Sequence, residues 1–480
     1  MEHVDVLVVG AGISGIDAAY HLQTSCPQRS YAILEARDAI GGTWDLFRYP
    51  GIRSDSDMYT LGFPFRPWMG DKAIADGASI LAYIRETAAH YGIDKKIRFR
   101  HRVERASWSS ANARWTIEAR NAATGELHTL TCNFLYGCSG YYDYDAGYTP
   151  AFAGRERFGG TIVHPQHWPA DLDYAGKRVV VIGSGATAVT LAPALAAQAA
   201  HVTMLQRSPT YIATVPARDP IAGMFRRLLP ETTAAAATRW KNIGMTMAFY
   251  QFCRRFPAQA KRMLVGQVKK QTHGTVDVRT HFTPRYRPWD QRLCLVPDAD
   301  LFRAIEAGTV SIVTDYIESF TETGLRLQSG ATLEADIIVT ATGLSLKVFG
   351  GLSLEVDGAK VEAPDTMLYK GMMCSGIPNF AFAVGYTNAS WTLKCDLTSQ
   401  YVCRLLNFMD DHSFARVVPR RDPAVAEAPL LDFSSGYVQR SIDKFPRQGS
   451  IVPWKLYQNY ALDLWMIRRG RIDHPALEFT

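Results

Sequence analysis

Three glycines followed by an acidic residue form the clearest chemical pattern near the N-terminus. The apolar run VDVLVV leads into Gly10-x-Gly12-x-x-Gly15, and a second apolar run, YAIL, leads to Glu35, twenty residues after Gly15. Glycines in this pattern allow a tight turn and a close approach of the backbone to a pyrophosphate, and the carboxylate accepts hydrogen bonds from ribose hydroxyls. The pattern predicts a dinucleotide site.

A second glycine pattern ends on a basic residue instead of an acidic one. The run RVVVIGSGATAV is followed by a strand-like segment, HVTMLQRS, that ends at Arg207 and Ser208. An arginine there can pair with a ribose 2′-phosphate, which a carboxylate would repel. We therefore predict an NADPH site made by Gly183, Ser184, Gly185, Ala186, Thr187, Ala188, Arg207 and Ser208. Two such sites suggest that the chain holds FAD and NADPH together for hydride transfer.

These motifs need parallel sheets to position them, so the predicted fold class is α/β with two Rossmann-like dinucleotide-binding domains, one for FAD and one for NADPH. We expect the FAD domain to take residues 1–145 and 340–480, the latter with the C-terminal region. The NADPH domain takes residues 146–339, with a helical insertion at about 216–285. The segment 336–343 predicts a strand that returns to a small-residue turn beside a dinucleotide.

Charge is unevenly distributed along the 480 residues. The net charge is +6, and the segment from Arg218 to Lys270 holds eleven Lys and Arg residues against Asp219 and Glu231. Aromatic and aliphatic residues interleave with these basic residues, which predicts amphipathic helices with a cationic face. A solvated face, a peripheral membrane contact and a substrate funnel are the open interpretations. No nucleic-acid partner is expected, because no nucleic-acid-binding motif accompanies the charge.

Eight cysteines are present, without a CxxC pair or the spacing of a zinc site, so no disulfide framework and no metal site are predicted. The uncharged segment 179–200 has the length of a membrane span, but it reads as a strand, a glycine turn and an alanine-rich helix. No pattern of a secretory signal precedes the first apolar run. We expect a cytoplasmic protein, with peripheral membrane association as the alternative.

A motif between the two glycine patterns identifies a family. The chain reads Phe158-x-Gly160-x-x-x-His164-x-x-x-Trp168, and an earlier segment, GGTWDLFRYPGIRSD, ends at Asp55. Both resemble signatures of the Baeyer–Villiger monooxygenases, which are class B flavoprotein monooxygenases. The stretches HPQHWPADLDY, VTMLQRSPTYI and PWDQRLCLVP extend the resemblance to the ethionamide-activating branch over nearly the whole chain. In this light the motif looks like an interdomain linker in which His164 holds the two domains in orientation.

The resemblance implies a reaction and a set of residues. NADPH would reduce FAD, O₂ would add to give a C4a-peroxyflavin, and the peroxide would convert ketones to esters or lactones, with sulfides and thioamides as further substrates and prodrug activation as one consequence. Arg292 matches the active-site arginine, and Asp55 matches the carboxylate that positions it. The lysine that often precedes this arginine is replaced by Gln291. The expected FAD contacts are Ser14, Glu35, Thr43, Trp44, Asp45, Leu46, Asp55 and Val103, and the expected further NADPH contacts are Arg53, Ser54 and, near the nicotinamide, Trp454.

Two alternatives remain open at the level of sequence. A flavin monooxygenase restricted to sulfur or nitrogen oxygenation would depend less on Arg292. A flavin-fold protein that binds without turnover would also carry the glycine patterns. Substrate identity and oligomeric state are not predicted.

Overall fold

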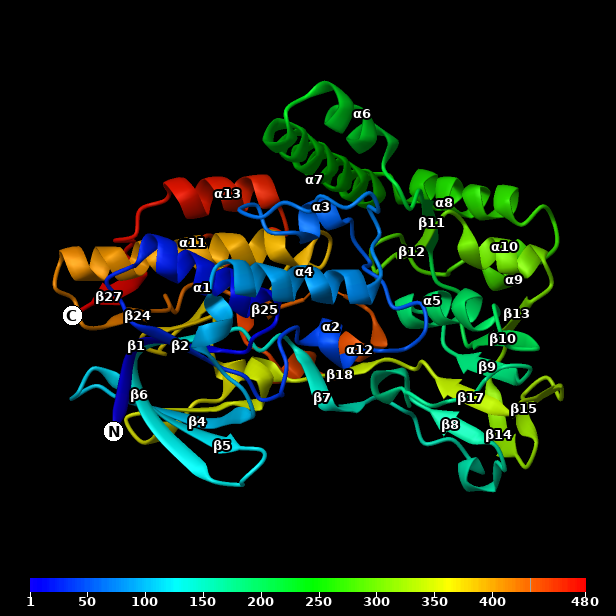
Figure 1. Cartoon of the computed structure of the whole chain (residues 1–480), viewed down its shortest axis with the longest axis horizontal. Coiled ribbons are helices and arrows are strands. Elements are labelled where there is room, and N and C mark those ends of the chain that lie inside the picture. Colours follow the sequence, from blue (N-terminus) through cyan, green and yellow to red (C-terminus); the bar gives the residue numbers. More distant parts are fainter. Residues whose placement is uncertain (432) are drawn as a thin grey trace.

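The computed structural model describes residues 1–431 and 433–480, and its two largest sheets lie side by side along the long axis (Figure 1). The first sheet has nine strands in the order β20-β19-β4-β5-β6-β1-β2-β3, with β23 paired to β6. Its strands are β1 (Glu2–Val9), β2 (Tyr31–Leu34), β3 (Ile97–Arg98), β4 (His101–Ser109), β5 (Arg114–Asn121), β6 (Leu127–Gly137), β19 (Ser353–Val356), β20 (Ala359–Lys360) and β23 (Phe380–Phe382).

The second sheet is parallel throughout and has the order β13-β10-β9-β17-β8. Its strands are β8 (Thr161–Val163), β9 (Arg178–Ile182), β10 (His201–Gln206), β13 (Val310–Thr314) and β17 (Ile337–Thr340). A small antiparallel sheet of β14 (Ile317–Thr321), β15 (Gly324–Leu327) and β16 (Thr332–Glu334) adjoins it.

Each of the two central strands is buried on both faces, which explains the continuous apolar runs in the sequence. Val6 and Val8 of β1 belong to one core, and Leu7 belongs to the core on the other side of the sheet. In the same way, Val181 and Val180 of β9 belong to two cores on opposite sides of the second sheet. The first core lies under α1 (Ile13–Ser25), α4 (Gly77–His90) and α11 (Trp391–Asp411), and α5 (Ala186–Leu195) covers the second sheet.

An antiparallel two-stranded ribbon connects the sheets. The chain leaves the first sheet through β7 (Tyr142–Gly147) and returns through β18 (Leu344–Leu346), and the two segments pair with each other (Figure 1). The boundaries predicted after residues 145 and 339 fall within β7 and near the end of β17. A division into two domains at these positions remains our proposal.

The motif at Phe158–Trp168 is not a free linker, which corrects the expectation from sequence. Thr161–Val163 form the edge strand β8, Phe158 is buried against the small antiparallel sheet, and Trp168 packs near Tyr174. A Cβ on Gly160 would lie 2.4 Å from the carbonyl oxygen of Asp336, so a larger residue would not fit beside the sheet. The segment belongs to the second sheet, and the β7–β18 ribbon makes the connection.

His164 touches that ribbon from the second sheet. Its Nδ1 accepts a hydrogen bond from the backbone N–H of Gln166 at 3.2 Å, so its Nε2 carries the proton and donates to the carbonyl oxygen of Gly343 at 3.2 Å. Burial lowers the pKa of His164 and favours this neutral form. His164 therefore positions the ribbon against the second sheet.

Four helices lie in the region of the predicted insertion: α6 (Pro220–Leu228), α7 (Glu231–Arg255), α8 (Pro257–Gln271) and α9 (Val278–His281). Helix α6 and α7 project above the rest of the molecule, and α13 (Tyr460–Arg469) lies along the same edge (Figure 1). In the part of the chain that the structure describes, no helix combines the length and the apolar character needed to cross a membrane.

Candidate active site

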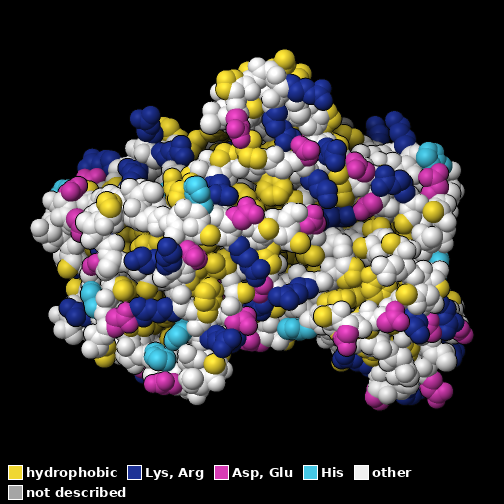
Figure 2. All heavy atoms as spheres, in the orientation of Figure 1, with side chains coloured by type: hydrophobic (Ala, Val, Ile, Leu, Met, Phe, Trp, Pro, Cys, Tyr) yellow, Lys and Arg dark blue, Asp and Glu magenta, His cyan; other side chains and the backbone are white. Residues whose placement is uncertain are grey.

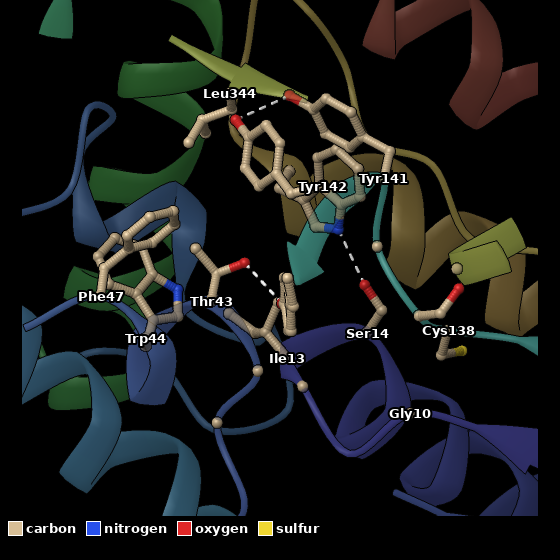
Figure 3. Close-up of a pocket in the computed structure, with 18 of the residues that line it drawn as sticks. Gly10, Ile13, Ser14, Thr43, Trp44, Phe47, Cys138, Tyr141, Tyr142 and Leu344 are labelled. Atoms are coloured by element: carbon tan, nitrogen blue, oxygen red, sulfur yellow. Dashed lines mark hydrogen bonds between the residues drawn. The ribbon is translucent and has the colours of Figure 1, made fainter. Parts of the chain in front are cut away.

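A cavity of about 320 Å³ lies between the two sheets, and residues from both of them line it. Figure 3 shows how the turn at Gly10, the start of α1 at Ile13 and Ser14, and the side chains of Thr43, Trp44, Tyr141 and Tyr142 surround this space. Cavities at such junctions of parallel sheets are typical cofactor sites.

The turn at Gly10 needs glycine because its φ is +109° and a Cβ there would lie 2.6 Å from the carbonyl oxygen of Cys138. Gly12 follows as the first residue before α1, and no side chain caps this helix, so its first backbone amides face the cavity without a side-chain partner. Glu35 is buried at the cavity wall. Its carboxylate accepts hydrogen bonds from the backbone N–H of Ala11 at 2.7 Å and of Arg37 at 2.8 Å.

Burial raises the pKa of Glu35, and the two backbone hydrogen bonds oppose this shift. The carboxylate lies beside the helix terminus that would face a pyrophosphate, so its remaining lone pairs are available to ribose hydroxyls. This geometry fits the role that the sequence predicts for Glu35.

A second group of side chains lies at the end of the cavity near α11. The indole N–H of Trp391 donates to the hydroxyl of Ser14 at 2.8 Å, and that hydroxyl donates to the Cys395 sulfur at 3.4 Å. The ring of Trp391 stacks on Tyr141 with 5.0 Å between ring centroids. On the facing side, the hydroxyls of Thr43 and Tyr144 are 3.0 Å apart. Aromatic rings and hydroxyls at such a position could enclose an isoalloxazine ring.

The segment from Phe47 to Asp55 crosses from the first sheet to the second. Phe47 and Tyr49 are buried in the core of the second sheet, and a Cβ on Gly51, whose φ is +77°, would lie 2.7 Å from the Cβ of Ala194. Next, Arg53 forms an ion pair with Asp300, which begins the helix α10 (Asp300–Glu306) on the side of the second sheet. Ser54 is buried, and its hydroxyl accepts from the N–H of Ala75 at 3.2 Å.

Asp55 and Arg292 meet at the cavity although 237 residues separate them. A guanidinium nitrogen of Arg292 lies 2.7 Å from a carboxylate oxygen of Asp55, and both residues line the cavity. Arg292 comes from the segment just before β12 (Cys294–Pro297), which pairs with β11 (Ile212–Val215). Burial opposes the charge of Arg292, but the Asp55 carboxylate and the neighbouring tyrosines together raise its pKa above the usual value. The guanidinium is therefore a fixed positive charge that faces the cavity.

The second glycine turn resembles the first in its backbone. Gly183 has φ of +143°, and a Cβ there would lie 2.3 Å from the carbonyl oxygen of Ala341, just after β17. The hydroxyl of Ser184 donates to the backbone oxygen of Ser208 at 3.1 Å, which holds the end of β10 beside this turn. Arg207 is exposed there. Ala186 and Thr187, at the start of α5, line the cavity.

The predicted residues separate into two groups by position. The cavity is lined by Gly10, Gly12, Ser14, Glu35, Thr43, Trp44, Arg53, Ser54, Asp55, Val103, Ala186, Thr187 and Arg292. Gly15, Leu46, Ala188, Gly183, Ser184, Gly185, Arg207 and Ser208 are not among its lining residues.

Asp45 and Trp454 are two further predicted contacts that do not line the cavity. Asp45 is buried away from the cavity wall, and its carboxylate forms ion pairs with Arg37, Arg48 and Arg85. The Asp45 carboxylate therefore belongs to a structural cluster of ion pairs. Trp454 is buried in the core of the first sheet, where its ring lies 5.8 Å from Tyr369 in an edge-on contact. It does not line the cavity, so the expected contact with the nicotinamide is not supported.

Sequence reasoning missed the aromatic lining. Tyr141, Tyr142 and Tyr144 follow β6 in the run GYYDYD, and Trp391 begins α11. Two features could have indicated the run: it follows a buried strand, and it contains three tyrosines within four residues. Burial raises the pKa of Tyr142, so its hydroxyl is uncharged beside Arg292.

The residues present fit the two cofactors that the sequence predicts. Near Gly12 the cavity wall is backbone without side chains, and the Cα of Gly42 faces it, which leaves space for a diphosphate. Glu35 supplies the acceptor for a ribose on that side. At the second turn no atom lies within 4 Å of a Cβ built on Gly185, and Arg207 supplies a cation nearby without a carboxylate at that strand end.

Comparisons with known proteins agree with this geometry. A family model described as flavin-binding monooxygenase-like matches residues 62–221, and one for an NAD(P)-binding Rossmann-like domain matches residues 8–69. The FAD-containing monooxygenase EthA of Mycobacterium tuberculosis is 60% identical over all of this chain and 98% of its own length. EthA of Mycolicibacterium smegmatis is 56% identical over 97% of its length, and the probable FAD-binding monooxygenase AlmA of Acinetobacter baylyi is 48% identical over 96%.

Solved structures with similar folds include a steroid monooxygenase bound to NADP, with a TM-score of 0.76, 23% identity and 99% of each chain covered. A complex of OTEMO with FAD and NADP has a TM-score of 0.74, 20% identity and 99% of each chain covered. The open form of a cyclohexanone monooxygenase has a TM-score of 0.75 at 18% identity over both full chains.

The OTEMO complex carries both cofactors predicted from sequence, and the steroid monooxygenase carries NADP. Together with the relatives, these neighbours confirm the α/β fold with two Rossmann-like units and the enzyme class. The alternative of a binding protein without turnover loses its support. The chain belongs to the family of FAD-containing monooxygenases that includes EthA, and it has the fold of the Baeyer–Villiger monooxygenases.

Proposed function

We propose that this protein uses FAD, NADPH and O₂ to insert an oxygen atom next to the carbonyl of small ketones, giving esters or lactones. In the balanced reaction, one ketone, O₂, NADPH and a proton give one ester, NADP⁺ and water. Sulfides and thioamides are the second proposed substrate class. The sulfur then receives the oxygen atom without any migration of carbon.

The Arg292–Asp55 ion pair at the cavity is the observation that carries this proposal. Oxygen transfer to a carbonyl carbon places negative charge on the attacking oxygen and then on the former carbonyl oxygen. A guanidinium that keeps its proton can stabilise both charges without transferring a proton itself. Asp55 holds that guanidinium in one direction, and its own charge limits the net field at the site.

FAD, when bound, supplies the electrons that activate O₂, and NADPH supplies them to FAD. Around Gly10, Gly12 and Glu35 the chain would hold the adenosine diphosphate half, and Ser14, Tyr141 and Trp391 would enclose the ring. The turn at Gly183, with Arg207 and Ser208, would hold the NADPH phosphates. With both cofactors bound, the aromatic side chains would also help to exclude water from the space beside Arg292, which would favour oxygen transfer over the release of hydrogen peroxide.

The other expectations about partners and place are also proposals. A ring ketone is the substrate named for a neighbour of similar fold, the cyclohexanone monooxygenase, which was also solved with ε-caprolactone bound. We propose a cytoplasmic protein, because NADPH is supplied there. Contact with a membrane depends on a different face of the molecule, formed by α6, α7 and α13.

A ketone panel tests the proposed reaction. The purified protein, loaded with FAD, is given NADPH and cyclic, linear or aryl ketones, and ester, hydrogen peroxide and NADPH consumption are measured together. An aryl sulfide and a thioamide are run in parallel. We expect esters from some of the ketones, in an amount close to the NADPH consumed in excess of peroxide.

Two results would speak against the proposal. Sulfoxide formation without ester from any ketone would restrict the enzyme to sulfur oxygenation. Peroxide in an amount equal to the NADPH consumed, with every substrate, would show that the cavity does not support oxygen transfer.

A further inference from the structure

Helix α6 presents its apolar side chains to solvent. Ile221, Met224 and Leu228 fall within an arc of about 60° when successive residues are turned by about 100°. Their exposed fractions are 42%, 47% and 72%. The opposite side of the helix carries Ala222, which is buried against Tyr59 and Ala73. A surface helix of a water-soluble protein normally has the reverse arrangement, with polar residues outside and apolar residues inside.

Polar contacts on the inner side hold α6 in this orientation. Arg226 donates to the backbone oxygen of Met69 and to the hydroxyl of Tyr59, each at 3.1 Å. Asp219 caps the helix by accepting from the N–H of Ile221 and of Ala222, and it forms an ion pair with Lys241 of α7. An arginine is thus turned inward while the apolar stripe points outward, and the helix is anchored at both ends.

The exposed apolar surface continues onto α7 and α13, which come from distant parts of the sequence. Trp240 of α7 is half-exposed, and its ring lies 6.1 Å from that of Tyr460 at the start of α13. Trp465 of α13 is exposed as well. The same helix packs against the segment 452–456, which places the exposed Val452 at its side. Figure 1 shows α6, α7 and α13 along one edge of the molecule. We call this set the α6–α13 surface: Ile221, Met224, Leu228, Trp240, Val452 and Trp465.

Exposed basic side chains lie on the same three helices. Arg227 of α6, Arg255 of α7 and Arg469 of α13 have no ion pair among the described residues. Figure 2 shows Lys and Arg beside hydrophobic side chains on the projection at the top of the view, where α6 and α7 lie. Two acidic residues lie on this part of the chain: Asp219 is already paired with Lys241, and Glu231 is exposed at the start of α7.

We propose that the α6–α13 surface binds peripherally to a membrane that contains anionic lipids. An apolar stripe accompanied by unpaired cations matches the acyl and headgroup regions of such a membrane. The stripe can enter the acyl boundary while the cations contact lipid phosphates. Trp240 and Trp465 suit the headgroup level, where indole rings are favoured.

This inference is independent of the proposed reaction. It locates the membrane contact expected of the basic insertion and extends it to α13 and Val452, which the charge pattern did not indicate. Apolar substrates that dissolve in the bilayer would then be concentrated next to the enzyme.

Vesicle flotation tests the proposal with the FAD-loaded protein. The vesicles contain phosphatidylcholine alone or phosphatidylcholine with phosphatidylglycerol, each at low and high salt. Leu228→Glu places a charge in the stripe, and Leu127→Glu is the matched control, because Leu127 is 43% exposed on β6 of the first sheet. The flavin absorbance of each variant shows that it is folded.

We expect the wild type and Leu127→Glu to float with vesicles that contain phosphatidylglycerol, and to float less with phosphatidylcholine alone or at high salt. Leu228→Glu should reduce the floating fraction about fivefold or more, because a charged carboxylate would then have to enter the acyl boundary in place of an apolar leucine. Equal flotation of the two variants would overturn the proposal, as would a wild type that does not float. A wild-type dimer in light scattering that Leu228→Glu converts to a monomer, without vesicle binding, would assign this surface to a second copy of the chain.

Discussion

At the scale of single residues, the function depends on charges whose surroundings fix them. Asp55 holds the guanidinium of Arg292, which is charged in its own right, and two backbone amides fix Glu35. Arg207 is exposed at the end of β10 beside the second glycine turn. Each of these groups can be removed singly, and each removal has a different expected readout.

Replacing Arg207 by alanine should weaken the use of NADPH far more than the use of NADH. A charge-assisted contact with the 2′-phosphate contributes about 1.5 to 3 kcal/mol, which corresponds to an increase in KM for NADPH of about tenfold or more. Steady-state kinetics with both nucleotides measures this, with Arg326→Ala as the control, because Arg326 lies on β15 in the small antiparallel sheet. Equal losses with NADPH and NADH would remove the proposed role of Arg207.

A buried cluster between α1 and α11 should make stability depend on pH. Asp17 and His21 of α1 meet Asp396 of α11, with Arg239 and Arg468 nearby. Burial raises the pKa of Asp17. Burial by itself lowers the pKa of His21, but the hydrogen bond to Asp396 and the charges of Asp17 and Asp396 together raise it. The folded state therefore binds more protons than the unfolded state above the ordinary pKa of aspartate, so stability falls as the pH rises from there through the two raised pKa values.

Asp17→Asn should flatten this dependence and stabilise the protein at pH 8 relative to pH 5, compared with the wild type. Urea unfolding of the FAD-loaded protein at several pH values between 5 and 8 gives the measurement. A wild type whose free energy of unfolding rises with pH, or a variant with the same slope, would contradict the assignment.

The sequence predicted the residues that follow a rule of spacing and missed those that do not. Gly12, Glu35 and Arg292 belong to patterns with a physical reason for each position, and the structure places all three at the cavity. Tyr141 and Trp391 meet only because β6 and α11 pack side by side, and a contact between residues 250 apart leaves no local pattern. Asp45 lies within a family signature, but its carboxylate forms ion pairs with three arginines of the surrounding fold.

At the scale of elements, the β7–β18 ribbon sets how the two sheets face each other. Its strands pair through Leu344 and Gly147, and His164 packs on this pair from the second sheet. Gly147 leaves the space that the imidazole occupies: a Cβ there would lie 2.0 Å from a ring carbon of His164. The ribbon is therefore fixed by close packing as well as by hydrogen bonds.

Gly147→Ala should destabilise the protein by about 1 to 3 kcal/mol, the usual cost of overpacking. His164→Ala in the same chain removes the ring that the new methyl group meets, so the double variant should lose less than the sum of the two single changes. Urea unfolding measures these values, with Gly244→Ala as the control, because nothing lies within 4 Å of a Cβ at this position in α7. Additive losses would show that the methyl group does not meet the imidazole.

The sequence indicated the strands and helices around both glycine turns, because their apolar runs and glycines are local signals. It assigned Phe158–Trp168 to a linker, since an edge strand of three residues is too short for a recognisable alternation. That strand forms because the exposed edge of β17 accepts it.

At the scale of the whole molecule, the cavity exists only between the two halves. Arg53 pairs with Asp300 and Asp55 pairs with Arg292, so two ion pairs join the first sheet's side to the second at the cavity wall. Sequence patterns indicated two nucleotide units but not how they face each other, because this orientation results from many contacts between distant residues. The same holds for the α6–α13 surface, which joins residues 221 and 465.

Ester formation by Arg292→Ala is the most direct test of the central claim, the need for a fixed positive charge at the cavity. The variant is compared with the wild type and with Arg287→Ala, an exposed arginine on the same segment. Reduction of the bound flavin by NADPH without oxygen is measured separately from ester formed with oxygen. We expect flavin reduction within about tenfold of the wild type and a loss of ester of about 100-fold or more, while Arg287→Ala behaves like the wild type. Ester formation by Arg292→Ala at a rate near that of the wild type would contradict the account.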